Sequence, residues 1–470
     1  MKTLVDCLYA LDEVRSVSTI RSRKSSRAPL SDADVWHPAL RAHPTKLFVE
    51  TTTRCNLKCQ ACVKQASGNR ISEGDMSMAT FMALAPAFPF LESLVLSGIG
   101  EPLLHPNLDD FITAAKTLMP KESWVGFQSN GALLTKKRAE SLIAAGLGRI
   151  SLSVDSLCSD TFRQIREGGE LANVEDALSF LSSAKLSARR SEVEIGIEFV
   201  VRRDNVRELP EVLRWAASHG ASFAIVSHLL PYDTAHLPLI AYEYNSDEAL
   251  ALFESWERRA LAEGMDLNRY YDLLCKHTLF RTAEEKRLLD FGFEIMLDFF
   301  RQGVFFPLKN LVSRDDSLRE EVAQTFEAAK ATANEIGLRL TLPEITPKAD
   351  RNCPFIESGS VMVSWDGRIH PCYYLWHDCY CHFKGRDASR NNVSKSFGSV
   401  DQRNNLEIWN DPAFRSFRCE VLKYDFSACS DCSVVPCNLL NDPDFSNDCQ
   451  SSTVPCGDCF WCMGLFNCLQ

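Results

Sequence analysis

Three cysteines with a spacing that suits an iron–sulfur cluster follow the first strand-like run of the sequence. Cys55, Cys59 and Cys62 form a C-x3-C-x2-C pattern in the segment ETTTRCNLKCQACVKQ, residues 50–65. Cysteine thiolates bind the irons of such clusters, and a 4Fe–4S cube needs four ligands. Three cysteines leave one iron open, and an open position distinguishes a catalytic metal site from a structural one. The spacing therefore predicts a 4Fe–4S cluster that can bind a small molecule.

Three alternatives to the cluster compete for this motif. A zinc site would need a fourth Cys or His, and none lies within about 40 residues except His37 and His43. A redox pair of Cys59 with Cys62 would leave Cys55 without a role. Three thiols that bind nothing would make the spacing a coincidence. The cluster is the favoured interpretation because it uses all three cysteines.

Six short apolar runs are expected to form the strands that position this motif. They are KLFVETT (46–52), LESLVLSG (91–98), SWVGFQSN (123–130), GRISLSVD (148–155), EVEIGIEFVV (192–201) and ASFAIVSH (221–228). Amphipathic stretches lie between them, and two of these end at a glycine, which is a usual helix stop. Alternation of strands and helices at this spacing predicts βαβ units and a parallel sheet. We expect an α/β fold, either doubly wound or barrel-like.

Glycines and polar residues stand at the ends of the second, third and fourth strand-like runs. The candidates are Gly98, Gly100, Glu101, Asn130, Ser153 and Asp155. Glycines let a backbone approach a ligand closely, and a carboxylate suits an ammonium partner. Ser153 and Asp155 share one face of their strand, although a capping turn before a helix would explain them equally well. Parallel α/β folds place ligands at these strand ends, so we expect the candidates to lie near the cysteines.

The cysteine motif and the order of these residues resemble the radical S-adenosylmethionine (SAM) superfamily. In that family the open iron binds SAM, and an electron from the cluster yields a 5′-deoxyadenosyl radical that abstracts a substrate hydrogen. The resemblance implies a partial (β/α)6 barrel. It also implies that Glu101, with Gly98 and Gly100, binds the SAM amino group, and that Ser153 and Asp155 reach the SAM carboxylate and ribose. Asn130 lies in a turn similar to the family's Thr-Asn-Gly turn. The sequence departs from the Gly-Gly-Glu segment of the family because Ile99 interrupts the glycines.

The C-terminal part of the chain is dense in cysteine. Of the 19 cysteines, thirteen lie between Cys353 and Cys468, and clustered cysteines in a reducing compartment indicate metal ligands. The spacing resembles the SPASM extension of radical SAM enzymes, which binds one or two auxiliary 4Fe–4S clusters. It departs from that pattern in one gap and lacks a C-x3-C step. A zinc ribbon of two C-x2-C pairs is the alternative.

The expected ligand assignment divides these cysteines between two clusters. One cluster is expected to use Cys353 and Cys372 with two tail cysteines, and a hairpin at Asp366-Gly367 would deliver Cys372. The other is expected to use Cys429, Cys432 and Cys437 with one tail cysteine. The tail cysteines in this assignment are Cys456, Cys459 and Cys468. The cysteines less favoured as ligands are Cys379, Cys381, Cys419 and Cys462.

The remaining features set the domain organisation and exclude some functions. We expect an N-terminal arm (1–45), a radical SAM core (46–235), a mainly helical insertion with the last core helix (236–345), and a SPASM-like domain (346–470). The aromatic stretch 291–306 is expected to pack between helices rather than form a substrate-facing lid. A net charge of -11 argues against nucleic-acid binding. The sequence lacks a membrane span and a signal peptide, so we expect a cytoplasmic protein.

The sequence as a whole predicts a radical SAM enzyme with SAM, a SAM-binding 4Fe–4S cluster and one or two auxiliary clusters as cofactors. The expected reaction is a maturase-type modification of a peptide, protein or cofactor, driven by a reductant such as ferredoxin or flavodoxin. Two alternatives remain: a radical dehydrogenase of a small alcohol or sugar, and a non-enzymatic iron–sulfur electron carrier. The sequence identifies no catalytic base or radical-quenching residue.

Overall fold

One sheet organises the fold. The structure is a computed structural model that describes residues 37–68, 71–304, 306–383, 390–427, 447–448 and 451–469. Its nine-stranded sheet has the order β11-β10-β1-β3-β4-β5-β7-β8-β9. The strands are β1 (Lys46–Val49), β3 (Ser93–Val95), β4 (Trp124–Ser129), β5 (Arg149–Ser153), β7 (Glu194–Val201), β8 (Phe223–His228), β9 (Arg339–Thr341), β10 (Ser360–Val363) and β11 (Ile369–His370). All neighbours pair in parallel except β10 and β11.

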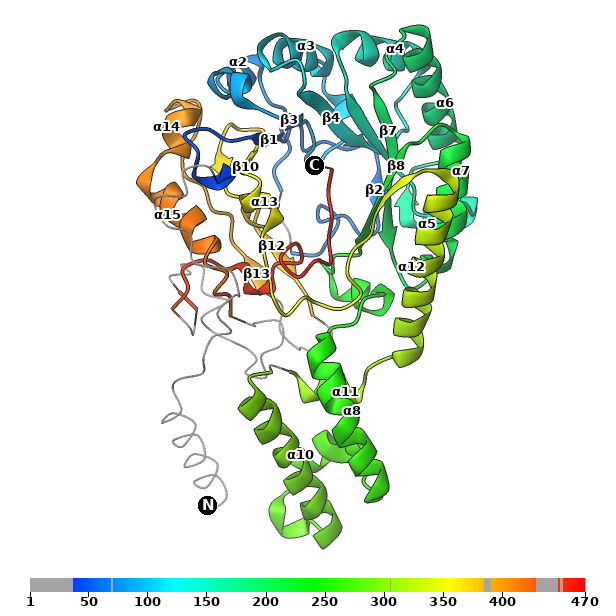
Figure 1. The fold of residues 1–470 in the computed structure, drawn as a ribbon, viewed down its shortest axis with the longest axis vertical. Coiled ribbons are helices and arrows are strands. Elements are labelled where there is room, and N and C mark those ends of the chain that lie inside the picture. The colour runs from blue at the N-terminus through cyan, green and yellow to red at the C-terminus, as the bar shows by residue number, and fades with distance from the viewer. Residues whose placement is uncertain are drawn as a thin grey trace.

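The sheet curves without closing, so the predicted partial barrel is confirmed (Figure 1). Each of the six predicted strands is present, and a further strand, β9, lies at one edge of the sheet. The strands β3, β4, β5 and β8 are short and buried along most of their length, as expected for a parallel sheet covered by helices.

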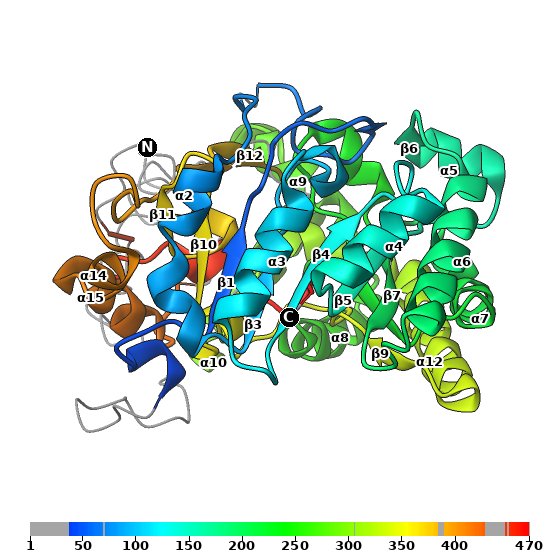
Figure 2. The same cartoon turned by 90° about the horizontal axis from the view of Figure 1, so that it is seen from above.

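Helices cover the outer face of the sheet (Figure 2). They are α2 (Met78–Met82), α3 (Leu108–Leu118), α4 (Lys136–Ala145), α5 (Ser159–Ile165), α6 (Leu171–Ser187), α7 (Leu209–Ser218) and α12 (Asp316–Ile336). Local chemistry sets their ends: the Thr135 side chain accepts a hydrogen bond from Arg138 at the start of α4, and Gly146 ends it with φ 108°. Their apolar faces form one continuous core with the strands. Among the described residues, no helix is long and apolar enough to cross a membrane.

A lobe of four helices stands away from the sheet (Figure 1). It consists of α8 (Asp247–Ala262), α9 (Tyr270–Cys275), α10 (Ala283–Gln302) and α11 (Leu308–Val312). The lobe has a hydrophobic cluster of its own, to which α10 contributes Phe291, Ile295 and Phe299. The expectation that the aromatic stretch packs between helices is confirmed for these residues, whereas Phe293 is 42% exposed.

The C-terminal part extends the sheet of the core. Strand β10 pairs with β1 from Lys46↔Ser360 to Val49↔Val363, so the sheet continues across the expected boundary at residue 346. Around it lie α13 (Pro354–Glu357), α14 (Asn405–Trp409), α15 (Pro412–Val421) and the hairpin of β12 (Cys379–Cys381) with β13 (Arg390–Asn392). The tail then runs into the space that the sheet encloses (Figure 1). There Asn467 donates through Nδ2 to the carbonyl of Val226 in β8 over 2.9 Å.

Candidate active site

The loop after β1 brings the three motif cysteines together. Within this loop β2 (Lys58–Cys59) pairs with β6 (Arg166–Glu167), so that Cys59 lies opposite Arg166. The Cys62 amide donates to the Cys59 carbonyl over 3.1 Å. The Leu57 amide donates to the Cys55 sulfur over 3.5 Å. The sequence of the motif therefore folds into a compact turn held by backbone hydrogen bonds and a short strand pair.

The pKa values of these thiols bear on how a cluster would bind here. Burial raises the pKa of all three thiols, and that of Cys62 to about 11. Iron binds thiolates, so cluster assembly has to displace these protons. Among the described residues no three Cys, His, Asp or Glu side chains converge closely enough to hold a single metal ion. A 4Fe–4S cube is larger than one ion and takes one thiolate on each iron, so three thiols spaced around a turn suit it.

Glu101 is a buried carboxylate in the segment that follows the next strand, β3. Its Oε1 accepts from the Ser129 hydroxyl over 2.8 Å and from the Leu103 amide over 3.1 Å. Its Oε2 accepts from the Asn130 amide over 2.8 Å. Burial raises the pKa of Glu101 against these hydrogen bonds. Because a carboxylate has about four acceptor sites, Oε2 can accept one further donor.

Asn130 and Glu101 lie on the same side of the sheet as the cysteine loop. The Asn130 side-chain amide donates to Asn56 over 3.0 Å and points toward the Cys55 sulfur, 3.9 Å away. The turn after β4 thus connects the buried carboxylate to the cysteine turn. The structure brings together these three candidates, which lie far apart in the sequence.

Asp155 is engaged with Arg166, a residue that sequence reasoning did not identify. Arg166 Nε lies 2.7 Å from Asp155 Oδ2, and the Val200 amide donates to Oδ1 over 2.9 Å. Arg166 Nη1 also lies 4.0 Å from the Cys59 sulfur. Burial by itself lowers the pKa of Arg166, but the Asp155 carboxylate and the Cys59 thiol raise it more. A permanent positive charge therefore lies beside the cysteine turn. Ser153 is partly exposed at the end of β5.

Glu198 on β7 is a second carboxylate, partly buried, that sequence reasoning left unassigned. It accepts a hydrogen bond from Gln128 Nε2 over 2.5 Å. Burial raises its pKa to about 7, against this hydrogen bond and the attraction of Arg166. Glu198 is therefore poised to exchange a proton near neutral pH.

The segment with Gly98 and Gly100 packs directly on the chain that follows β1. A Cβ at Gly98 would lie 2.4 Å from Glu50 Cγ. A Cβ at Gly100 would lie 2.4 Å from the Thr52 carbonyl oxygen and 2.5 Å from that of Arg54. Only glycine permits this approach. The spacing of the two glycines thus has a structural cause, and Ile99 between them does not interfere.

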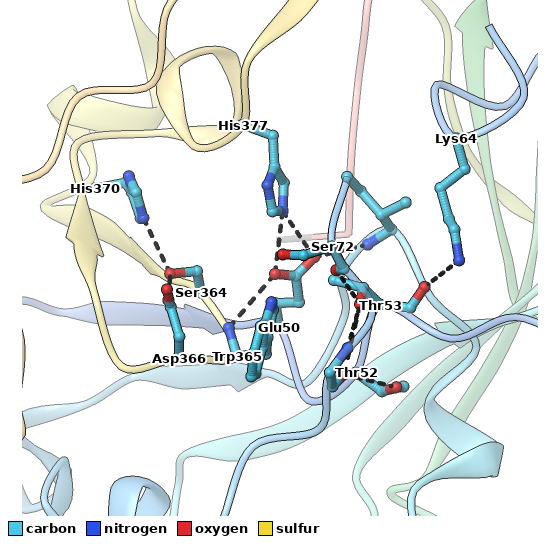
Figure 3. Close-up of polar contacts among 12 residues, drawn as sticks. Glu50, Thr52, Thr53, Lys64, Ser72, Ser364, Trp365, Asp366, His370 and His377 are labelled. Carbon is cyan, nitrogen blue, oxygen red and sulfur yellow. Dashed lines mark hydrogen bonds and ion pairs between the residues drawn. The ribbon is translucent and has the colours of Figure 1, made fainter. Parts of the chain in front are cut away.

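Glu50 connects this segment to the C-terminal part of the chain (Figure 3). The side chain is fully buried, and both of its oxygens lie 3.1 Å from His377 Nε2. The Ile99 amide donates to Oε1 over 3.3 Å and the Trp365 amide to Oε2 over 3.4 Å. Three segments distant in sequence therefore meet at one carboxylate.

A cavity of about 230 Å³ lies between these strand ends and the C-terminal part. Its wall on the barrel side includes Ser97, Gly98, Gln128 and Glu198. Its remaining lining includes the aromatic side chains of Tyr232, Tyr373, Tyr374, Trp376, Phe460, Trp461 and Phe466. Among the described residues the hydroxyls of Tyr373 and Tyr374 are buried without a hydrogen-bond partner. The described lining residues include no Lys or Arg.

Five C-terminal cysteines lie close to one another. The Cys462 thiol is hydrogen bonded to those of Cys353, Cys456 and Cys459. Cys372 lies near three of the same thiols, and burial raises its pKa well above the usual value. The group is Cys353, Cys372, Cys456, Cys459 and Cys462. Cys353 and Cys372, which we expect to share a cluster, therefore lie near tail cysteines. The group also includes Cys462, which the sequence pattern favours less as a ligand.

The other C-terminal cysteines are placed differently. Cys468 lines the cavity and lies near Lys46 and Tyr373. Cys379 and Cys381 also line the cavity. Cys419 is partly buried on α15. The expected ligands Cys429, Cys432 and Cys437 lie outside the described residues.

Comparison with known proteins relates the chain to iron–sulfur enzymes. Residues 49–217 match the Radical SAM superfamily and residues 353–433 match SPASM, an iron–sulfur cluster-binding domain. The chain is 26% identical over 431 residues to the tungsten-containing aldehyde ferredoxin oxidoreductase cofactor-modifying protein of Pyrococcus furiosus, covering 90% of this chain and 96% of that protein. It is 29% identical over 245 residues to the GTP 3′,8-cyclase of Mycobacterium marinum, covering 51% of this chain and 66% of the cyclase. Among solved structures, SuiB of Streptococcus suis bound to S-adenosylmethionine aligns with a TM-score of 0.47 at 14% identity, over 82% of this chain and 70% of that one.

Proposed function

Because the chain belongs to the radical SAM superfamily of enzymes and carries a SPASM domain, we propose that it cleaves SAM reductively and uses the resulting 5′-deoxyadenosyl radical to modify a cofactor. Its cofactors are 4Fe–4S clusters and SAM. The observation that carries the proposal is the shared cavity: strand-end residues beside the cysteine turn form one wall, and the C-terminal part forms the others.

The residues of the cysteine turn have separate roles in this proposal. Cys55, Cys59 and Cys62 would hold the cluster, which when bound supplies the electron that cleaves SAM. Glu101 would accept a hydrogen bond from the SAM ammonium group at the free acceptor site of Oε2. Arg166 holds Asp155 in position and places a positive charge beside Cys59, which stabilises the negative charge of a thiolate-bound cluster.

Other residues around the cavity would orient SAM and exclude water. Gly98 and Gly100 let their segment pack against the chain after β1 and so position it at the ligand site, while Ser153 and Asp155 would bind polar groups of SAM. The buried pair of Glu50 and His377 fixes the C-terminal part against the glycine segment, and this contact closes one side of the cavity.

The cavity favours a planar heteroaromatic cofactor as the substrate. Aromatic side chains offer faces for stacking, and the unpartnered hydroxyls of Tyr373 and Tyr374 offer hydrogen bonds to ring heteroatoms. This agrees with the name of the Pyrococcus furiosus relative, a cofactor-modifying protein. We do not propose GTP as the substrate. A triphosphate requires Arg, Lys or metal partners, and the described lining residues include neither Lys nor Arg.

The two alternatives fit less well. A dehydrogenase of a sugar or small alcohol has less use for the seven aromatic side chains that line this cavity. A simple electron carrier would not need a cavity beside an incomplete cysteine site.

The test is anaerobic cleavage of SAM. The reconstituted protein is incubated with SAM and reduced flavodoxin, and 5′-deoxyadenosine is quantified. We expect the wild-type protein to form it, the Cys59→Ala protein to form none, and the Cys275→Ser protein, changed at an exposed thiol on α9, to behave as wild type. Adding GTP should not increase the rate. Formation at the parent rate by the Cys59→Ala protein would refute the proposal.

A further inference from the structure

Two thiols lie side by side in the wall of the cavity. Cys379 and Cys381 are separated by one residue of strand β12, so alternation places their side chains on the same face. Both line the cavity, and Cys381 is 3% exposed. Their thiols are hydrogen bonded to each other. The intervening Tyr380 points the other way and is 37% exposed.

The strand opposite supplies a donor to both sulfurs. Asn392 on β13 pairs with Cys379 across the hairpin. Its side-chain amide lies 3.4 Å from the Cys381 sulfur and 3.9 Å from that of Cys379. Hydrogen bonds from the Cys381 thiol and from Asn392 lower the pKa of Cys379, while the bond to Cys379 raises that of Cys381. This arrangement favours one thiol beside one thiolate.

This pair differs from the group of five cysteines around Cys462. The hydrogen bonds of the Cys462 thiol go to other cysteines of that group, whereas Cys379 and Cys381 bond to each other. Two neighbouring thiols that interact with each other suit dithiol–disulfide chemistry.

We propose that Cys379 and Cys381 form a redox-active dithiol that donates a hydrogen atom to a carbon radical in the cavity. The inference rests on the proposed function, which supplies the radical. The S–H bond of one cysteine breaks and a C–H bond forms, leaving a thiyl radical. The neighbouring thiolate adds to it and forms the S–S bond as a disulfide radical anion. That anion passes one electron to a one-electron acceptor of the iron–sulfur class. An external dithiol then supplies two electrons and one proton, which restores one thiol and one thiolate, and the second proton of the external dithiol goes to solvent.

The experiment follows the hydrogen atom in heavy water. The holoenzyme in D2O receives SAM and reduced flavodoxin without substrate, so the 5′-deoxyadenosyl radical itself is the carbon radical. Because thiol hydrogens exchange with solvent, we expect the 5′-deoxyadenosine to carry one deuterium. We also expect the peptide with both cysteines to resist alkylation, as a disulfide does. In the Cys379→Ser and Cys381→Ser proteins the disulfide should be lost, and in the double variant with both substitutions the deuterium should also fall to natural abundance, with iron content unchanged in all three proteins.

Three control measurements test whether the pair itself is the hydrogen donor. The Cys275→Ser protein should keep the wild-type deuterium content. Deuterium that depends on Cys468, the third described thiol of the cavity wall, instead of the pair would overturn the inference. A loss of iron from either variant at Cys379 or Cys381 would also overturn it, because the pair would then be cluster ligands.

A SAM-independent measurement separates failure of the dithiol from failure of the proposed function. Phenylarsine oxide bridges neighbouring thiols, and the wild-type holoenzyme should bind one equivalent more than either serine variant. If no 5′-deoxyadenosine forms although this equivalent binds, the proposed function fails and, with it, the radical step of the inference. If 5′-deoxyadenosine forms but the extra equivalent does not bind, only the dithiol is refuted.

Discussion

Glu198 should make the protein less stable as the pH rises from 5 to 8, and the substitution Glu198→Gln should remove this contribution. Its pKa rises from 4.5 to about 7, first because of burial. A carboxyl group whose pKa is higher in the folded state binds more protons there than in the unfolded chain, so it lowers stability as the pH increases between these two values. From pH 5 to pH 8 the full effect is about 2.5 kcal/mol at about 1.4 kcal/mol for each pH unit.

The cavity reduces this value because part of the Glu198 side chain faces it and water there screens the charge. We therefore expect the wild-type protein to lose about 1–2.5 kcal/mol relative to Glu198→Gln between pH 5 and pH 8. Glutamine keeps the size of the side chain and can still accept the hydrogen bond from Gln128. The assay is anaerobic urea unfolding of both proteins at both pH values, with the contribution of all other groups cancelling in the difference. A difference in unfolding free energy that is equal at pH 5 and pH 8 would refute this account.

Three further substitutions test the site. Gly100→Ala places a methyl group against two backbone carbonyls, so we expect about 1–3 kcal/mol of destabilisation and weaker SAM binding by equilibrium dialysis; unchanged SAM affinity would contradict the packing argument. Arg166→Met leaves Asp155 as a buried unpaired charge, so we expect a loss of about 3–5 kcal/mol in urea unfolding, partly recovered in the double variant with Asp155→Asn; a strictly additive double variant would show that the pair is not coupled. Glu50→Gln weakens the bond to His377, so we expect faster amide hydrogen exchange in residues 373–377; protection equal to wild type would show that the C-terminal part does not depend on this contact.

The sheet can be predicted from the sequence because each strand is a short apolar run bounded by turn residues. The strand at 194–201 is located in this way, and its carboxylate Glu198 is visible in the sequence. The environment of that carboxylate is not visible there, because the raised pKa depends on how deeply the fold buries it and on Gln128 and Arg166 from other elements. Periodicity predicts which face of a strand a residue occupies, but not what lies opposite that face.

The contacts that sequence reasoning missed are long-range and lack a local signal. Arg166 belongs to a strand of two residues, which is too short to produce an alternating pattern. His377 reaches Glu50 across 327 positions of sequence. Cysteine spacing likewise indicates that the C-terminal part binds metal, but it does not indicate that Cys462 lies with Cys353 while Cys468 lines the cavity. The spacing of cysteines in the sequence indicates which of them share a cluster only where the ligands are close in the chain.

The sheet that the core shares with the C-terminal part positions the cysteine turn of Cys55 relative to the cysteine group around Cys462. Strand β1 leads directly into the turn of Cys55, and its neighbour β10 leads through a hairpin to Cys372. Four register pairs join these strands, and Glu50 accepts hydrogen bonds from the residues that follow β3 and β10. A movement of one cysteine group relative to the other would therefore require breaking ladder hydrogen bonds and exposing a buried carboxylate, each at a cost of about 1–3 kcal/mol. The separation of the SAM site from the group around Cys462 is thus set by the sheet, and substrate entry has to depend on movement elsewhere in the cavity wall.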